Sequence, residues 1–180
     1  MAEYNVNNPI NVWVGNLGKY TEGELVGEWF GLPCYDFEEE WDELMQLIGI
    51  GGRYEEVFCA DWECSIPGLE YSEYPDYEEL DSIAQEWDSL GADEQDAVGI
   101  RMSLMEEDVY KAIEHKDDVR IYHGCDCMRD VAERYIRDTG MLDQSDFLSS
   151  YFDYEAFGRD MALDGYFTYS DELGCMVEAW

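Results

Sequence analysis

The sequence predicts an α+β fold made of three small domains. Strand-like alternation of apolar and polar residues occurs near both ends of the chain, whereas the middle repeats its apolar residues at helical spacing. Glycines and prolines punctuate the chain, and no low-complexity linker or clear repeat interrupts it. We therefore expect an α+β domain over residues 1–68, a helical domain over residues 69–117 and an α+β domain over residues 118–180.

The first domain begins with a run in which Ile10, Val12 and Val14 alternate with less apolar residues, a pattern typical of a strand. Asp36, with Glu39 three residues later, has the spacing of a helix N-cap. We expect strands at 10–14, 25–30 and 54–60, and a helix that begins after Asp36 and ends near Gly49.

The middle domain is predicted from one amphipathic helix. At about 100° per residue, its apolar residues between Leu80 and Leu90 fall within one arc of roughly 120°. The opposite side is acidic, and two shorter helices are expected at 97–104 and 109–113. The acidic side carries Glu78, Glu79, Asp81, Glu86 and Asp88.

The last domain opens with a strand-like segment at 119–123. A helix is expected over 128–139, with Gly140 as its end, and a mostly helical stretch over 147–162. Two further strand-like segments flank residues 171–174 and predict a closing hairpin.

The charge of the chain is extreme. It has 180 residues, with 44 acidic and 10 basic side chains, so its net charge is −34. The 47 positions between Arg53 and Arg101 hold fifteen Asp or Glu and no basic residue. Such a field repels nucleic acid and anionic membranes, so we expect no direct binding to either. It would attract a basic protein groove instead.

Charge density suggests a shape for that interaction. Duplex DNA carries one negative charge per ~1.7 Å of axis, so 34 charges correspond to about 58 Å of duplex, or about 17 base pairs. An elongated string of small domains could carry carboxylates at that density, whereas a sphere would spread them all round. A merely solvated acidic surface of halophilic type also fits the composition.

The segment His123–Cys127, with its C-x-C spacing, is the most metal-like part of the chain, but tetrahedral zinc needs four matched ligands. Calcium-loop spacing and phosphate-loop glycine patterns are missing, and pairs of carboxylates occur too often here to indicate a glycosidase. We predict no enzyme activity, no metal site and no cofactor. The N-terminus lacks signal-peptide features and no segment has membrane-spanning length, so a cytoplasmic location with six reduced cysteines is expected.

Five segments together resemble the ArdA-type antirestriction proteins, in order along nearly the whole chain. They are WVGNLGKYTEGELVGEWF (13–30), DWECSIP (61–67), CDCMRDVAERYI (125–136), SSYFDYEAFGRDM (149–161) and DGYFT (164–168). The resemblance implies a mimic of bent B-form DNA that occupies the DNA groove of type I restriction–modification enzymes. It also implies a curved, elongated chain of three domains, encoded on mobile elements, that forms a homodimer through its C-terminal domain.

The residues expected to carry this function are exposed carboxylates that stand in for phosphates. For each one the alternative is a solvated position whose loss changes little. They are Glu38, Glu39, Glu40, Asp61, Glu63, Glu73, Asp76, Glu78, Glu79, Asp81, Glu86, Asp88, Asp93, Glu94, Asp96, Glu106, Glu107 and Asp108.

The antirestriction tract of the resembled family maps onto roughly Gly140–Asp153. Its acidic members could contact the partner, whereas its apolar members are more typical of packing or dimer contacts. The candidates are Asp143, Asp146, Phe147, Leu148, Tyr151, Phe152 and Asp153. Two alternatives to the main hypothesis remain: an acidic mimic directed at another DNA-binding protein, and an acidic metal-binding protein.

Overall fold

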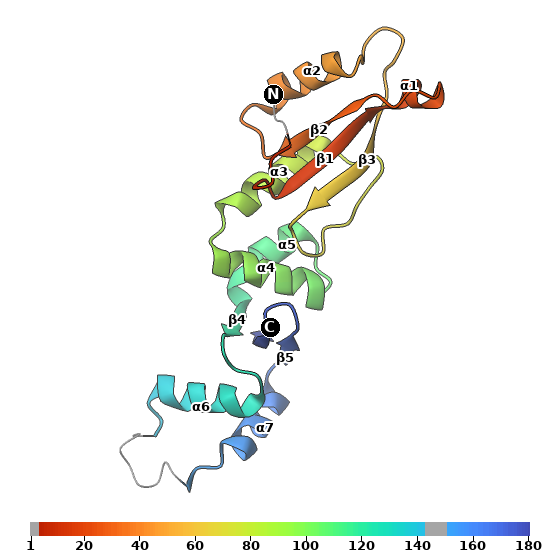
Figure 1. Ribbon diagram of the computed structural model, residues 1–180. Coiled ribbons are helices and arrows are strands. Elements are labelled where there is room, and N and C mark those ends of the chain that lie inside the picture. Colours follow the sequence, from red (N-terminus) through yellow and green to blue (C-terminus); the bar gives the residue numbers. More distant parts are fainter. Residues whose placement is uncertain (1–3, 143–150) are drawn as a thin grey trace. The chain divides into compact units, whose positions relative to one another are not determined.

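The computed structural model describes residues 4–142 and 151–180 and confirms an α+β fold (Figure 1). The chain forms two compact units. Unit 1 comprises Met1–Gln95 with Asp108–Tyr110, and unit 2 comprises Asp96–Glu107 with Lys111–Trp180. The expected three-domain division and elongated form stay predictions. No helix among the described residues is both long enough and apolar enough to cross a membrane.

Unit 1 is built on a three-stranded antiparallel sheet whose central strand is β1 (Ile10–Asn16). Strands β2 (Gly27–Leu32) and β3 (Val57–Cys64) flank it, in the order β2-β1-β3. Val12 pairs with Phe30 on one side and with Trp62 on the other. Strand β1 has a partner along both edges, and all of its residues except Trp13 are buried.

The first strand was predicted closely, whereas the third lies further along the chain than expected. Tyr54 forms an isolated bridge to Gly51, so it closes a turn rather than opening a strand. The strand then continues past residue 60, because Asp61–Cys64 still pair with the beginning of β1. The short helix α1 (Leu17–Thr21) was not expected; the side chain of Asn16 caps it by accepting a hydrogen bond from the Lys19 amide at 3.0 Å.

Helix α2 (Phe37–Leu47) begins where the sequence predicted. The Asp36 carboxylate accepts the Glu39 backbone N–H at 3.2 Å. Trp41 packs against Phe30 of the sheet with ring centroids 5.6 Å apart, and it contacts Tyr77 at 4.6 Å. The aromatic side chains therefore join α2, the sheet and the next helix into one core.

Three helices follow: α3 (Tyr77–Ser89), α4 (Ala92–Leu104) and α5 (Val109–Glu114). The predicted apolar face of α3 is buried in unit 1, including Leu80, Ile83 and Trp87. The division between the two units falls within α4, after Gln95.

Unit 2 holds a second antiparallel sheet, in the order β4-β6-β5, formed by Val119–Tyr122, Cys175–Ala179 and Phe167–Ser170. The predicted closing hairpin is present as β5 and β6. Beside the sheet lie α6 (Met128–Thr139) and α7 (Tyr154–Asp164). Gly140 ends α6 with a left-handed φ of 66°, as expected for a helix stop.

The two helices of unit 2 approach each other closely at one glycine. Gly158 of α7 is buried, and a Cβ added there would lie 2.5 Å from the Met128 carbonyl oxygen at the beginning of α6. Only glycine allows that backbone approach. The core beside it includes Tyr122, Cys125 and Met176.

Candidate acidic interaction surface

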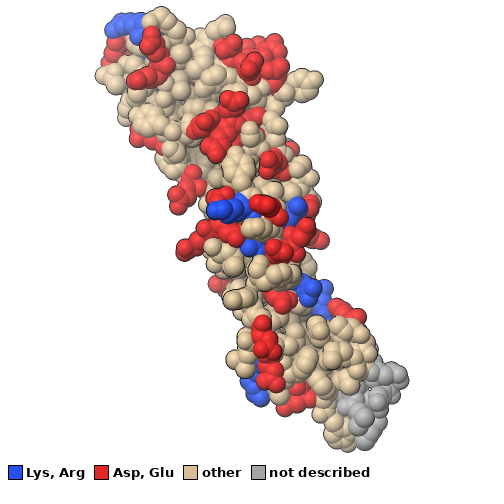
Figure 2. Space-filling view, turned by 180° about the vertical axis from the view of Figure 1, so that it is seen from behind, with Lys and Arg blue, Asp and Glu red and all other residues tan. Residues whose placement is uncertain are grey.

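Most of the predicted phosphate-mimicking carboxylates are exposed, and Figure 2 shows acidic side chains across the face that it presents. By sequence, unit 1 contains 25 acidic residues and two basic ones, and unit 2 contains 19 and eight. We call the exposed members the acidic surface: Glu38, Glu39, Asp61, Glu63, Glu73, Asp76, Glu78, Glu79, Glu86, Asp88, Asp93, Glu94, Glu106 and Asp108. Glu40, Asp96 and Glu107 are partly exposed.

Helix α3 presents the densest part of this surface. Asp76 caps the helix by accepting the backbone N–H groups of Glu78 and Glu79, each at 3.1 Å. Two carboxylates in the first turn are also favoured by the helix dipole. The exposed side of α3 then continues through Glu86 and Asp88.

The fold brings Asp76, Glu79 and Glu86 near one tyrosine. Burial first, and then the negative charge of Glu79 and Glu86, raise the pKa of Tyr110 above its usual value. Asp76 acts in the same direction more weakly. Several separate carboxylates therefore add to the effect of burial on this pKa.

The first turn of α2 presents a second group of carboxylates. Glu38 and Glu39 are exposed, and Glu40 accepts the Tyr35 backbone N–H at 3.1 Å. The side chain of Tyr35 is fully exposed beside them. Tyr35 was not among the predicted site residues. Its position directly before the capping residue Asp36 is the sequence feature that could have indicated it.

Strand β3 and the beginning of α4 carry further members. Glu63 accepts the Tyr4 hydroxyl at 2.7 Å, and Asp61 accepts the Trp62 backbone N–H at 2.9 Å. Glu94 accepts the Gly91 backbone N–H at 2.9 Å, which holds its carboxylate at the helix start, and Asp93 is exposed next to it. Local hydrogen bonds to neutral groups therefore orient several of these carboxylates.

The expected exposure of Asp81 is wrong. Its side chain is only 4% exposed, and its carboxylate accepts the Cys34 backbone N–H at 2.9 Å and the Gln85 side-chain amide at 2.6 Å. The helical wheel placed Asp81 on the acidic side of α3, but the loop after β2 covers that position. Burial and the Asp81 charge together raise the pKa of the Cys34 thiol to about 12. Asp81 therefore holds a loop in place and is not available to a partner.

Glu107 is a counter-ion rather than a free carboxylate. Its two oxygens accept hydrogen bonds from Arg101 Nε at 2.7 Å and Nη2 at 3.0 Å. This contact raises the pKa of Arg101, which is 4% exposed, and lowers the pKa of Glu107. Arg101 also donates to the Trp180 carbonyl at 3.1 Å, so the pair ties α4 to the C-terminal segment within unit 2.

The candidates from the antirestriction tract are only partly described. Asp143, Asp146, Phe147 and Leu148 lie outside the described residues. Asp153 caps α7 by accepting the Ala156 backbone N–H at 2.9 Å. Phe152 packs against Tyr154 and Phe157, whereas Tyr151 is exposed.

The cysteine cluster has no metal-site geometry in the described part of the chain. Across residues 4–142 and 151–180, no three His, Cys, Asp or Glu side chains are arranged to hold a metal ion. Cys125 is buried and Cys127 is exposed, with its thiol 3.3 Å from Asp130. All six cysteines are free.

The chain was compared with models of known protein families and with curated protein sequences. A family model described as antirestriction protein (ArdA) matches residues 12–173. No curated protein sequence matches the chain.

Proposed function

The chain belongs to the antirestriction protein (ArdA) family, and from that premise we propose that it inhibits type I restriction–modification enzymes by occupying their DNA groove. Family membership supports the antirestriction function. The finer statement, that the protein acts as a stoichiometric mimic of bent B-form DNA, rests on the placement of charge.

The observation that carries the proposal is the imbalance of charge in unit 1. Two basic residues cannot neutralise 25 acidic ones, and most predicted carboxylates are exposed on α2, α3, β3 and α4. A groove that binds DNA is lined with Lys and Arg, and electrostatic complementarity guides such partners together. The acidic surface offers these cations carboxylates in place of phosphates.

Inhibition on this basis needs no chemistry. Each exposed ion pair contributes only about 0–1 kcal/mol, so tight binding needs many pairs formed together. The inhibitor is bound and not consumed, and one bound protein blocks one groove. Because the attraction is between opposite charges, it weakens as salt screens them.

The experiment is competition for a DNA groove. A type I methyltransferase core is bound to a labelled target duplex and titrated with the protein at several salt concentrations. We expect displacement that is complete near stoichiometric protein when the enzyme concentration is well above Kd, and that weakens with rising salt. Polyglutamate at the same carboxylate concentration is the control, and it should displace far less duplex because its charges have no fixed arrangement.

No displacement at micromolar protein would refute the proposed target. The same titration against a nucleoid protein or a repressor bound to DNA would then test whether the mimic is directed at another DNA-binding protein.

We also propose that the protein is a homodimer that pairs through residues 118–180, as the family resemblance implies. Sedimentation velocity is measured at about 5–50 micromolar protein, which covers the concentrations of the competition assay. We expect a species of about twice the 20.9 kDa chain mass. A single species at the monomer mass would contradict this.

A further inference from the structure

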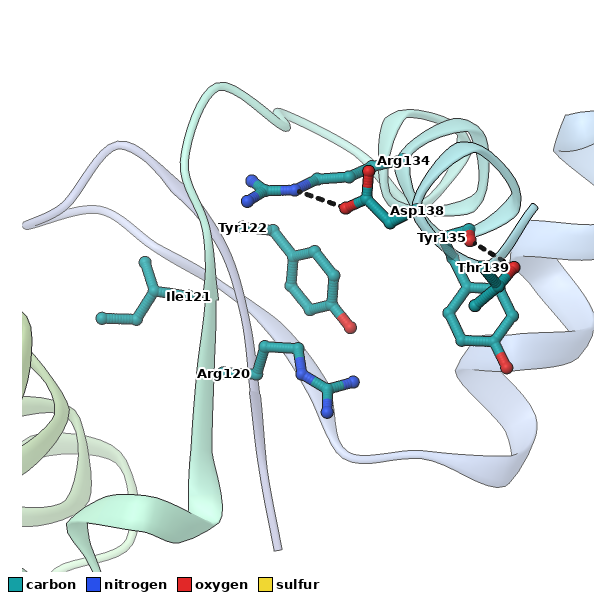
Figure 3. A pocket seen from close by; sticks show the side chains of 7 residues that line it. All are labelled: Arg120, Ile121, Tyr122, Arg134, Tyr135, Asp138 and Thr139. Carbon is teal, nitrogen blue, oxygen red and sulfur yellow. Dashed lines mark hydrogen bonds and ion pairs between the residues drawn. The ribbon is translucent and has the colours of Figure 1, made fainter. Parts of the chain in front are cut away.

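A pocket of about 300 Å³ lies between β4 and α6 in unit 2 (Figure 3). Its volume is at the lower end of the range for small-ligand sites. Figure 3 shows the Tyr122 ring between the side chains of Arg134 and Arg120, with helix α6 forming the other wall. The lining residues are Arg120, Ile121, Tyr122, Arg134, Tyr135, Asp138 and Thr139.

Arg134 is held in a defined position at this pocket. Its Nη1 donates to the His123 carbonyl at 3.2 Å, and its guanidinium carbon lies 5.9 Å from the centre of the Tyr122 ring. Its Nε is 3.5 Å from Asp138 Oδ2. The side chain is therefore oriented before any ligand arrives, while about a third of it remains exposed.

Arg120 is oriented from the other side. Its guanidinium carbon lies 5.9 Å from the centre of the Trp180 ring, and Nη1 is 3.6 Å from Glu178 Oε2. The same Glu178 oxygen accepts the Tyr122 hydroxyl at 2.9 Å. The Glu178 carboxylate therefore interacts with both the Tyr122 hydroxyl and, at a longer distance, the Arg120 guanidinium.

Both ion pairs are longer than a charge-assisted hydrogen bond, which is typically about 2.7–2.9 Å. A guanidinium carries five N–H donors. Arg120 contacts Glu178 and Tyr122, and Arg134 contacts His123, Asp138 and Cys125, so these neighbours engage part of each guanidinium. Arg101 shows the contrasting arrangement, since Glu107 holds it by two hydrogen bonds at 2.7 and 3.0 Å. The pocket arginines thus keep donors that a ligand can use.

The pocket lining carries two guanidiniums, those of Arg120 and Arg134, and one carboxylate, that of Asp138, in a chain of net charge −34. Outside the lining, Glu178 lies 3.6 Å from Arg120 and Arg137 lies 3.3 Å from Asp138. Two arginines in one lining work against mimicry of a polyanion. They also give this pocket a local preference for an anion that the rest of the molecule lacks.

We propose that this pocket is a binding site for one oxyanion group, a carboxylate or a phosphate, which is bound by the guanidiniums of Arg120 and Arg134 that line the pocket on either side of the Tyr122 ring. Arginine suits this role because its planar fork matches the geometry of both groups. The site is separate from the acidic surface and does not rest on the proposed antirestriction function. The net negative charge opposes anion entry at long range, but physiological salt screens charges beyond roughly 8 Å.

The test is an NMR titration of the full chain with sodium phosphate and, in parallel, with sodium acetate. Sodium chloride at matched ionic strength is the reference. We expect saturable shifts of the backbone amides of residues 119–123 and 134–139 and of the Trp180 indole N–H. Saturation with phosphate alone assigns a phosphate site, and saturation with acetate alone assigns a carboxylate site. Saturation with both supports the shared oxyanion chemistry.

Variants give the decisive comparison. Arg120→Gln and Arg134→Gln are each expected to weaken binding by about tenfold, the loss of one charge-assisted hydrogen bond. Arg129→Gln is the matched control, because it removes the same charge from α6 outside the pocket, where Arg129 pairs with Glu133 at 3.1 Å. Arg134→Lys keeps the charge but not the fork, and its intermediate affinity would separate lost ligand contact from a damaged fold.

Two results would overturn the proposal. One is a set of shifts equal in chloride, phosphate and acetate, which would indicate a general ionic-strength effect. The other is equal binding by the Arg120→Gln, Arg134→Gln and Arg129→Gln proteins, provided that their core amides show the native fold.

Discussion

Neutralising the exposed side of α3 should weaken inhibition gradually rather than abolish it. The four exposed carboxylates there are Glu78, Glu79, Glu86 and Asp88. We consider the quadruple variant in which each becomes Gln or Asn, together with the four single variants. The amide side chains keep the size of the originals and remove only the charge.

The expected magnitude follows from exposure. Fully solvated ion pairs are each worth about 0.2–1 kcal/mol, so four contribute roughly 2 kcal/mol to binding. That corresponds to about a 30-fold rise in the concentration needed for half-inhibition, whereas each single variant should differ from the parent by less than about fivefold. Removing like charges also relieves self-repulsion, so the folded state should not be weakened greatly.

The assay is the duplex competition described above, with urea unfolding as a check on the fold. The matched control neutralises four exposed acids of unit 2: Asp160, Asp164, Asp171 and Glu172. A similar loss in the control would mean that net charge alone matters and that placement on α3 does not. Complete loss from a single Glu→Gln change would refute a distributed mimic.

Three further predictions concern the fold and are measured by urea unfolding. Asp81→Ala should destabilise unit 1 by roughly 2 kcal/mol, because the partly buried Cys34 N–H loses its acceptor; an unchanged midpoint would contradict the anchoring role. Glu107→Gln should cost about 2–3 kcal/mol at pH 7 by leaving Arg101 unpaired, somewhat below the value for fully buried pairs. Because the folded pKa of Glu107 is lowered, this contribution is present above the usual carboxylate pKa of about 4.3 and is lost as pH falls through the lower folded value. The difference from the parent protein should therefore shrink below about pH 4.3, and a constant difference would argue against the pair. Gly158→Ala should destabilise unit 2 by roughly 1–3 kcal/mol, because the added Cβ would clash with the Met128 carbonyl oxygen. Gly165→Ala is not a suitable control, since a Cβ there would lie 2.4 Å from the Phe167 ring.

Much of the fold could be predicted because local signals agreed with the tertiary structure. The Asp36 cap, the apolar face of α3 and the Gly140 stop of α6 each lie where the sequence indicated. The misplaced start of β3 has a different cause. Tyr54 pairs with Gly51 in a turn instead of beginning a strand, and the spacing of apolar residues along the sequence does not indicate that pairing.

The candidate site was predictable in composition but not residue by residue. Helical spacing separates a polar side from an apolar side, and it correctly placed Glu78 and Glu86 in solvent. It could not indicate that a loop 47 residues earlier covers Asp81. Nor could it show that Glu107 would meet a buried arginine six residues away, because that contact depends on how α4 ends.

The helices themselves argue that the charge of α3 is retained for something other than stability. On α6, cations sit four residues from acids, as in Arg129–Glu133 and Arg134–Asp138, which is the spacing that supports a solvent-exposed helix. On α3, the position four residues after Glu78 is Ser82, where a lysine would form the same kind of pair without disturbing the buried side. A surface shaped by stability alone would use such a position, since one pair is worth a few tenths of a kcal/mol and would also lower self-repulsion. A helix with several acids and no basic residue of its own is favoured when a partner supplies the cations, which is the condition that the lining of a DNA groove meets.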